Sequence, residues 1–111
     1  MDWLPGLGNL FQQAQKMKEE VQQLQEGMGK KTIQSESGGG LVKVVVNGNQ
    51  QILSLSIEPE LLRKQDAAMI QDLVIAAVNQ AMGQSRDLMT EELKKLAGGL
   101  APLLSMLKGQ P

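Results

Sequence analysis

Residues 7–28 restrict the possible folds of this 111-residue chain more than any other segment, because their apolar side chains follow coiled-coil spacing. Between the apolar positions the residues are mainly Gln, Lys and Glu, which favour helix and remain in water. The segment therefore predicts a helix roughly 30 to 35 Å long whose apolar stripe needs a partner. Asn9 is its predicted N-cap, and Gly27 and Gly29 predict where it frays or ends. The stripe consists of Leu7, Leu10, Ala14, Met17, Val21, Leu24 and Met28.

The composition removes the usual machinery of most enzymes. The chain contains no Cys and no His, which excludes disulfides, thiol nucleophiles, thiolate or imidazole metal sites and imidazole acid-base catalysis. The adjacent pairs Glu19/Glu20 and Glu91/Glu92 point in different directions around their helices, so we interpret them as solvated surface. We expect no enzymatic activity, no cofactor and no metal. No apolar run approaches the ~20 residues of a membrane span, so we expect a cytoplasmic protein without membrane contact.

The middle of the chain predicts three short antiparallel strands. Residues 32–37 tolerate β structure, and Gly38-Gly39-Gly40 then turns the chain. Residues 41–46 are mostly β-branched, Asn47-Gly48 is a strong hairpin signal, and residues 52–57 resume the alternation.

Strand alternation assigns the side chains of the hairpin to two faces. The predicted core face consists of Val42, Val44, Val46, Leu53, Leu55 and Ile57. The opposite face is half apolar, which predicts that another chain or another sheet covers part of it. That second face consists of Leu41, Lys43, Val45, Ile52, Ser54 and Ser56.

The second half of the chain predicts a short helix from Pro59 and then a long one. The long helix is expected to begin near Asp66 or Ala67 and to end at Gly98-Gly99. Residues 69–82 are apolar on almost every side, so we place them across the core face of the hairpin. Beyond Gly83 only a narrow apolar stripe remains. We expect this stripe to pack against the stripe of the first helix. It consists of Leu88, Met89, Leu93 and Leu96.

The basic residues give a local candidate site for phosphates, because a net charge of −1 argues against a globally basic surface. In a single chain these lysines need no binding role, because Lys30 and Lys31 interact favourably with the helix dipole and the others keep the protein in solution. In a twofold dimer each cluster is duplicated at a fixed spacing, and two modest patches can grip one duplex. The candidate phosphate contacts are Lys16, Lys18, Lys30, Lys31 and Lys43, with Arg86, Lys94 and Lys95 as secondary candidates.

Three motifs together resemble the YbaB/EbfC nucleoid-associated proteins of bacteria. They are Gly6-Leu7-Gly8-Asn9-Leu10, the segment Ser35 to Val44 with its three glycines, and Ile57-Glu58-Pro59-Glu60-Leu61-Leu62. The resemblance implies an α+β protein with an α-β-β-β-α protomer, a three-stranded antiparallel sheet, dimerisation through the sheets and two projecting helical arms. It covers residues 1–99, which we treat as one domain, and leaves residues 100–111 as a short apolar tail.

Two functions follow from this resemblance and from the residues. The first is a homodimer that binds double-stranded DNA through its phosphates with weak sequence specificity, alters DNA conformation and acts in the nucleoid and on gene expression. The second is a coiled-coil adaptor that binds another protein through its arms or its tail. The tail itself is expected either to pack as a small helix or to bind a protein partner. Dimer and arm packing is assigned to Leu7, Leu10, Met17, Val21, Leu24, Leu88 and Leu93.

Overall fold

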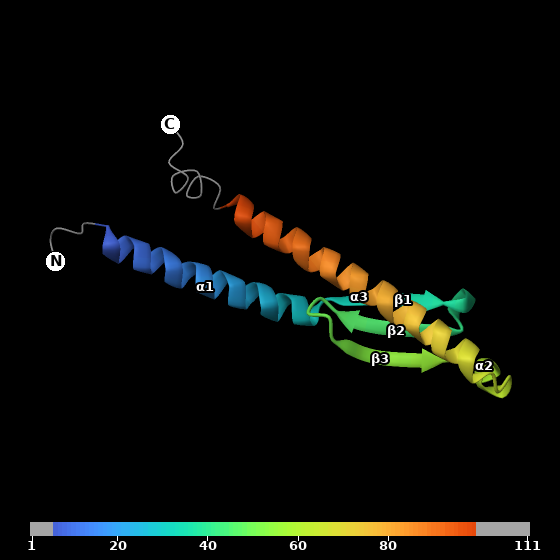
Figure 1. The fold of residues 1–111 in the computed structure, drawn as a ribbon. Helices are drawn as coiled ribbons and strands as arrows, with labels where there is room; N and C mark the ends of the chain where they lie inside the picture. The colour runs from blue at the N-terminus through green and yellow to red at the C-terminus, as the bar shows by residue number, and fades with distance from the viewer. Residues whose placement is uncertain (1–5, 100–111) are drawn as a thin grey trace.

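The computed structural model describes residues 6–99, so the predictions for the tail lie outside the described residues. One long helix, α3 (Ala67–Gly98), crosses a small sheet and continues past its end, and the other, α1 (Leu7–Lys30), extends away from that same end, so that both project as arms (Figure 1). This arrangement confirms the predicted α+β class and the α-β-β-β-α order, with one short additional helix. The elements are α1 (Leu7–Lys30), β1 (Thr32–Ser37), the 3₁₀ turn η1 (Gly38–Gly40), β2 (Val42–Asn47), β3 (Ile52–Ile57), α2 (Pro59–Arg63) and α3 (Ala67–Gly98).

The sheet is antiparallel, with strand order β1-β2-β3 and β2 in the centre. In the β2–β3 pair, Val42 stands opposite Ile57 and Val44 stands opposite Leu55. Directly paired residues project to the same side of a sheet. The predicted common face of these four side chains is therefore confirmed.

A register shift between Val45 and Val46 changes the rest of the hairpin. Ser54 stands opposite Val45, but Ile52 stands opposite Val46. One extra residue on a strand is a β-bulge, and it reverses the alternation on which face assignments depend. Because Ile52 pairs with Val46, its side chain lies on the side of Val46, and the assignment of Ile52 to the opposite face is wrong.

The core forms where α3 packs across β1 and β2. Ala77 and Ala81 are fully buried, and their small side chains let the helix approach the valines of β2 closely. At the far end of β1, the Ser37 hydroxyl donates a 2.6 Å hydrogen bond to the Leu73 carbonyl oxygen. The predicted placement of α3 across the core face of the hairpin is confirmed for β2, but the second strand that the helix covers is β1 and not β3. The core cluster consists of Val42, Val44, Val46, Leu61, Ala77 and Ala81.

The third strand remains uncovered, although its sequence is apolar. Ile52 is 51% exposed, Leu53 is 52% exposed and Leu55 is 46% exposed. The prediction that Leu53 and Leu55 belong to the closed core is thus wrong for a single chain. The physical reason is that α3 lies over β1 and β2, and a single helix cannot also cover β3.

The outer face of the sheet, which is turned away from α3, is more polar than predicted. Leu41 packs against the core cluster instead, as a partly buried residue. The register shift also puts Ile52 on the other face. Val45 is then the apolar side chain that remains on the outer face of the three strands. The prediction of a half-apolar outer face is wrong. Its other residues are Gln34, Glu36, Lys43, Ser54 and Ser56.

Both long helices follow their predicted extents, but the ends of α1 differ in detail. Its N-cap is Gly6, at φ 97°, and no side chain caps the helix. The prediction of Asn9 as N-cap is therefore wrong. The helix also continues through Gly27 and Gly29, because its last turn is held from outside by the β2–β3 loop. The predicted start of α3 near Asp66 or Ala67 is confirmed: Asp66 is the N-cap, and its carboxylate accepts a 3.0 Å hydrogen bond from the Met69 N–H.

The arms make the protein strongly elongated. Its extents are 75 × 27 × 17 Å and its radius of gyration is 21.7 Å, compared with about 13 Å for a compact chain of this length. Leu10, Phe11 and Leu93 are large apolar side chains of the arms that remain exposed. Within one chain, therefore, the apolar stripes of α1 and α3 do not cover one another along their full length.

Candidate nucleic-acid interface

The β2–β3 loop holds the inner end of α1. The Gly48 N–H donates a 2.8 Å hydrogen bond to the Met28 carbonyl oxygen, and the Asn49 side-chain amide donates one of 2.9 Å to the Gln25 carbonyl oxygen. The Met28 side chain is buried in this contact. The Met28 carbonyl is one of the last four of α1, which have no donor within the helix, so the loop supplies a donor where the helix lacks one.

The same loop also holds α3. The Ser85 hydroxyl, which is fully buried, donates a 2.8 Å hydrogen bond to the Asn47 carbonyl oxygen and accepts one of 3.1 Å from the Gln50 N–H. A single loop therefore contacts both arms where they leave the sheet. It fixes the positions of the arms relative to the sheet and to each other.

Replacing Gly48 by Ala is expected to destabilise this junction. A Cβ at residue 48 would lie 2.8 Å from the Met28 Sδ and 2.9 Å from the Met28 carbonyl oxygen. Since one of these neighbours is backbone, the loop and α1 must move apart, and we expect the free energy of unfolding to fall by about 1–3 kcal/mol. Urea denaturation followed by circular dichroism measures this change.

Gly27→Ala is the matched control for Gly48→Ala. A Cβ at residue 27 meets nothing within 4 Å, and the residue lies inside α1. Ala is favoured over Gly within a helix by roughly 0.5–1 kcal/mol, so this variant should be slightly more stable than the wild type. Equal stability of the two variants would contradict the tight contact between Gly48 and Met28.

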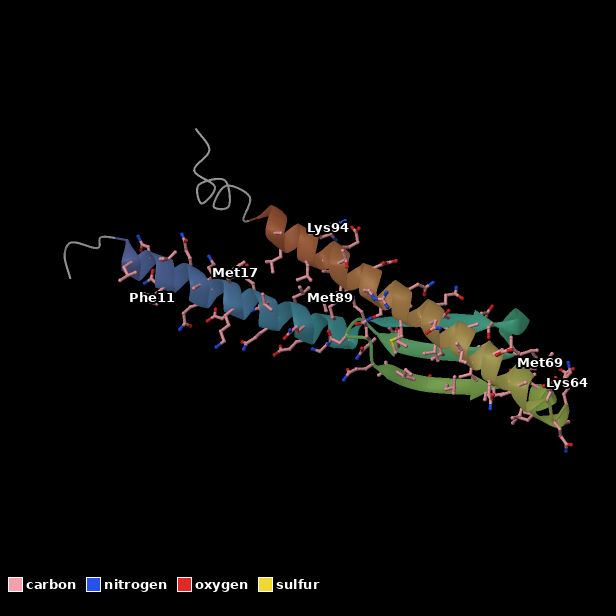
Figure 2. All side chains as sticks on the ribbon, in the orientation of Figure 1. Phe11, Met17, Lys64, Met69, Met89 and Lys94 are labelled. Carbon is pink, nitrogen blue, oxygen red and sulfur yellow. The ribbon has the colours of Figure 1, made fainter. Side chains whose placement is uncertain are left out.

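The candidate basic residues are distributed along both arms. Lys16, Lys18 and Lys30 are exposed on α1, and Lys31 follows directly as its C-cap. On α3, the exposed cations are Arg86, Lys94 and Lys95. Lys94 lies toward the free end of that helix, far from Lys64, which is the C-cap of α2 (Figure 2). Lys43 stands apart from the arms, on the outer face of the sheet and opposite Glu36.

Glu92 brings two of the predicted cations together. Its carboxylate oxygen Oε1 lies 3.4 Å from Nζ of Lys31 and 3.5 Å from Nζ of Lys95. The hydrogen bond from Lys31 and its charge, followed by the charge of Lys95, lower the pKa of Glu92 below its usual value. This carboxylate is therefore charged at neutral pH and joins the inner end of α1 to α3.

Sequence reasoning missed this role of Glu92. The spacing of Glu92 and Lys95 places them on neighbouring positions of one helix, which is visible in the sequence. Lys31 is 61 residues away, however, and no pattern in the sequence indicates that it meets Glu92. The interpretation of Glu92 as simple solvated surface is thus wrong, while Glu91 is exposed as expected.

Metal sites and membrane spans are absent from the part of the chain that the structure describes. Among residues 6–99, no group of three or more His, Cys, Asp or Glu side chains is arranged to hold a metal ion. No helix in this range is long and apolar enough to cross a membrane.

Known proteins are similar to this chain in sequence and in fold. The family model described as the YbaB/EbfC DNA-binding family matches residues 4–100. A protein of Chlorobium limicola named nucleoid-associated protein is 48% identical over 105 residues, covering 95% of this chain and 93% of its own. The nucleoid-associated protein TTE0040 of Caldanaerobacter subterraneus subsp. tengcongensis is 42% identical over 93 residues, covering 84% of each chain.

A solved structure agrees with these relatives. The crystal structure of the uncharacterized protein HP0035 from Helicobacter pylori superposes with a TM-score of 0.68 at 29% identity. The match covers 86% of this chain and 96% of that one. The elongated α-β-β-β-α fold and the sequence matches over nearly the whole chain lead to one conclusion: this chain belongs to the YbaB/EbfC DNA-binding family.

Proposed function

We propose that this chain binds double-stranded DNA as a homodimer, through backbone phosphates and with weak sequence preference. In this proposal it acts in the nucleoid of the bacterial cytoplasm, where it alters DNA conformation and thereby affects gene expression. Membership of a DNA-binding family and the names of its relatives support the DNA partner. The observation that carries the mechanism is the exposure of lysines along two projecting helices.

The homodimer is supported by the uncovered third strand. β3 is an edge strand that contains no charged residue, whereas the other edge strand, β1, contains Glu36. Edge strands without charged residues tend to pair with another chain. Ile75 of α3 adds a further exposed apolar side chain, at 56% exposure. A second copy of the chain would cover this surface and would bring two pairs of arms together.

The arms supply the phosphate contacts in this proposal. Lys16 and Lys18 on α1, and Lys30 and Lys31 at its inner end, are exposed, and Arg86, Lys94 and Lys95 add positive charge along α3. An ammonium group contacts phosphate as a point charge and carries no base readout. Weak sequence preference follows from this chemistry.

A salt series tests the phosphate mechanism. If about six phosphates are neutralised per dimer, the logarithm of the binding constant should fall with the logarithm of the salt concentration at a slope near −5. Fluorescence anisotropy with labelled duplexes of unrelated sequence measures both this slope and the sequence preference. A salt-independent affinity would contradict phosphate binding, and absence of binding at low salt would favour the protein-interaction adaptor instead.

A further inference from the structure

Glu92 is a charged group within the described region that directly contacts proposed DNA-binding residues. It accepts a hydrogen bond from Lys31 and lies within ion-pair distance of Lys95. The side chain of Glu92 is 21% exposed, whereas the side chains of Lys31 and Lys95 are 50% and 72% exposed. The two ammonium groups are thus accessible from solvent on the side that Glu92 does not occupy.

We propose that Glu92 is an intramolecular competitor of the DNA phosphates, which holds Lys31 and Lys95 in the free protein and limits the affinity of the arms for DNA. The inference rests on the proposed function, because it concerns cations assigned there to phosphate binding. It adds a residue whose negative charge tunes that binding, without itself contacting DNA.

The chemistry of the three groups supports this competition. Carboxylate and phosphate oxygens accept the same N–H donors of an ammonium group. When a phosphate approaches Lys31, it either displaces the Glu92 carboxylate or remains close to it and is repelled. In both cases part of the attraction between Lys31 and DNA is lost. If the carboxylate is displaced, it attracts a cation from solution.

This cation uptake gives the inference a signature in the salt dependence. Phosphate binding releases counterions from DNA, and the slope of affinity against salt counts them. Each cation that the displaced Glu92 takes up lowers by one the net number of cations released when DNA binds. Removing the charge of Glu92 should therefore steepen the slope as well as raise the affinity.

The test compares Glu92→Gln with Glu91→Gln in the full-length protein, with duplex DNA over a salt series. Both variants remove one negative charge from neighbouring positions of α3, but Glu91 makes no ion pair within residues 6–99. Since exposed ion pairs are weak, we expect Glu92→Gln to bind DNA about three- to tenfold more tightly than the wild type, with a steeper slope. Glu91→Gln should gain about twofold or less, with an unchanged slope.

A double-mutant comparison identifies the residues through which Glu92 acts. In a Lys31→Gln/Lys95→Gln background, the additional Glu92→Gln change should give no larger gain than Glu91→Gln does. Equal effects of the two Glu variants in the wild-type background, or a gain that persists without both lysines, would overturn the inference while leaving DNA binding intact. Absence of DNA binding by the wild type at low salt would instead overturn the proposed function, and this inference with it.

Discussion

Leu55→Asp should convert the protein into a folded monomer and lower its affinity for duplex DNA by about 100-fold or more. Leu55 stands opposite Val44 on the face beside α3, but it is 46% exposed in the single chain. A carboxylate is tolerated there as long as the site faces water. In the proposed dimer the same site is apolar and closed, and burying two charges in it is strongly unfavourable.

The loss of DNA affinity follows from the loss of the second pair of arms. Two linked sites gain about 10²- to 10⁴-fold in overall affinity over one site alone. Sedimentation velocity measures the association state of the variant, circular dichroism its folding, and fluorescence anisotropy its DNA binding. A Leu55→Asp protein that sediments as the wild type would contradict an interface on β3.

Ser56→Asp is the matched control for the position of this interface. Ser56 is the next residue of β3, but it stands opposite Lys43 on the polar outer face. We expect this variant to keep the association state of the wild type. Dissociation caused by Ser56→Asp, with none caused by Leu55→Asp, would place the contact between copies on the outer face instead.

Replacing both Lys30 and Lys31 by Ala should weaken DNA binding by about 100- to 1,000-fold near 0.1 M salt. The change removes two charges from the inner end of α1, and therefore four charges from a dimer. If about six phosphates are contacted, about two remain, and the slope against salt should fall from near −5 to near −2. The slope is the decisive measurement, because a folding defect would lower the active fraction without changing it.

Arg63→Ala/Lys64→Ala controls for the loss of net charge. These two cations lie at the junction of α2 and α3, at the end of the molecule away from the arm tips (Figure 2). The variant has the same net charge as Lys30→Ala/Lys31→Ala, yet we expect its slope against salt to match the wild type. Equal losses in both variants would mean that total charge, and not the arms, governs binding.

Periodicity in the sequence is sufficient to predict the helices and strands of this protein. The stripe from Leu7 to Met28 recurs at the repeat of a helix, and the β-branched run before Asn47-Gly48 alternates as a strand does. Such signals are local, because each depends on the spacing of side chains along one element. For this reason α1, the three strands and α3 were all predicted, with bounds that agree closely with the structure.

The face assignments in the hairpin needed the tertiary structure. An extra residue in β3, opposite Val45 and Val46, puts Ile52 on the side of Val46, and the alternating sequence of residues 52–57 gives no sign of it. The sequence also does not indicate that α3 leaves β3 uncovered. The number of strands that α3 covers depends on its crossing position, which the apolar surface of residues 69–82 does not specify.

The sequence by itself determined the elements, their order and the family, since these depend on local spacing and on motifs in a fixed succession. Only the tertiary structure decided which side chains from distant segments meet. It placed Glu92 against Lys31, and it attached both arms to the loop after Asn47. These contacts join residues far apart in the chain, and their partners are selected by the packing of whole elements, not by any pattern within one of them.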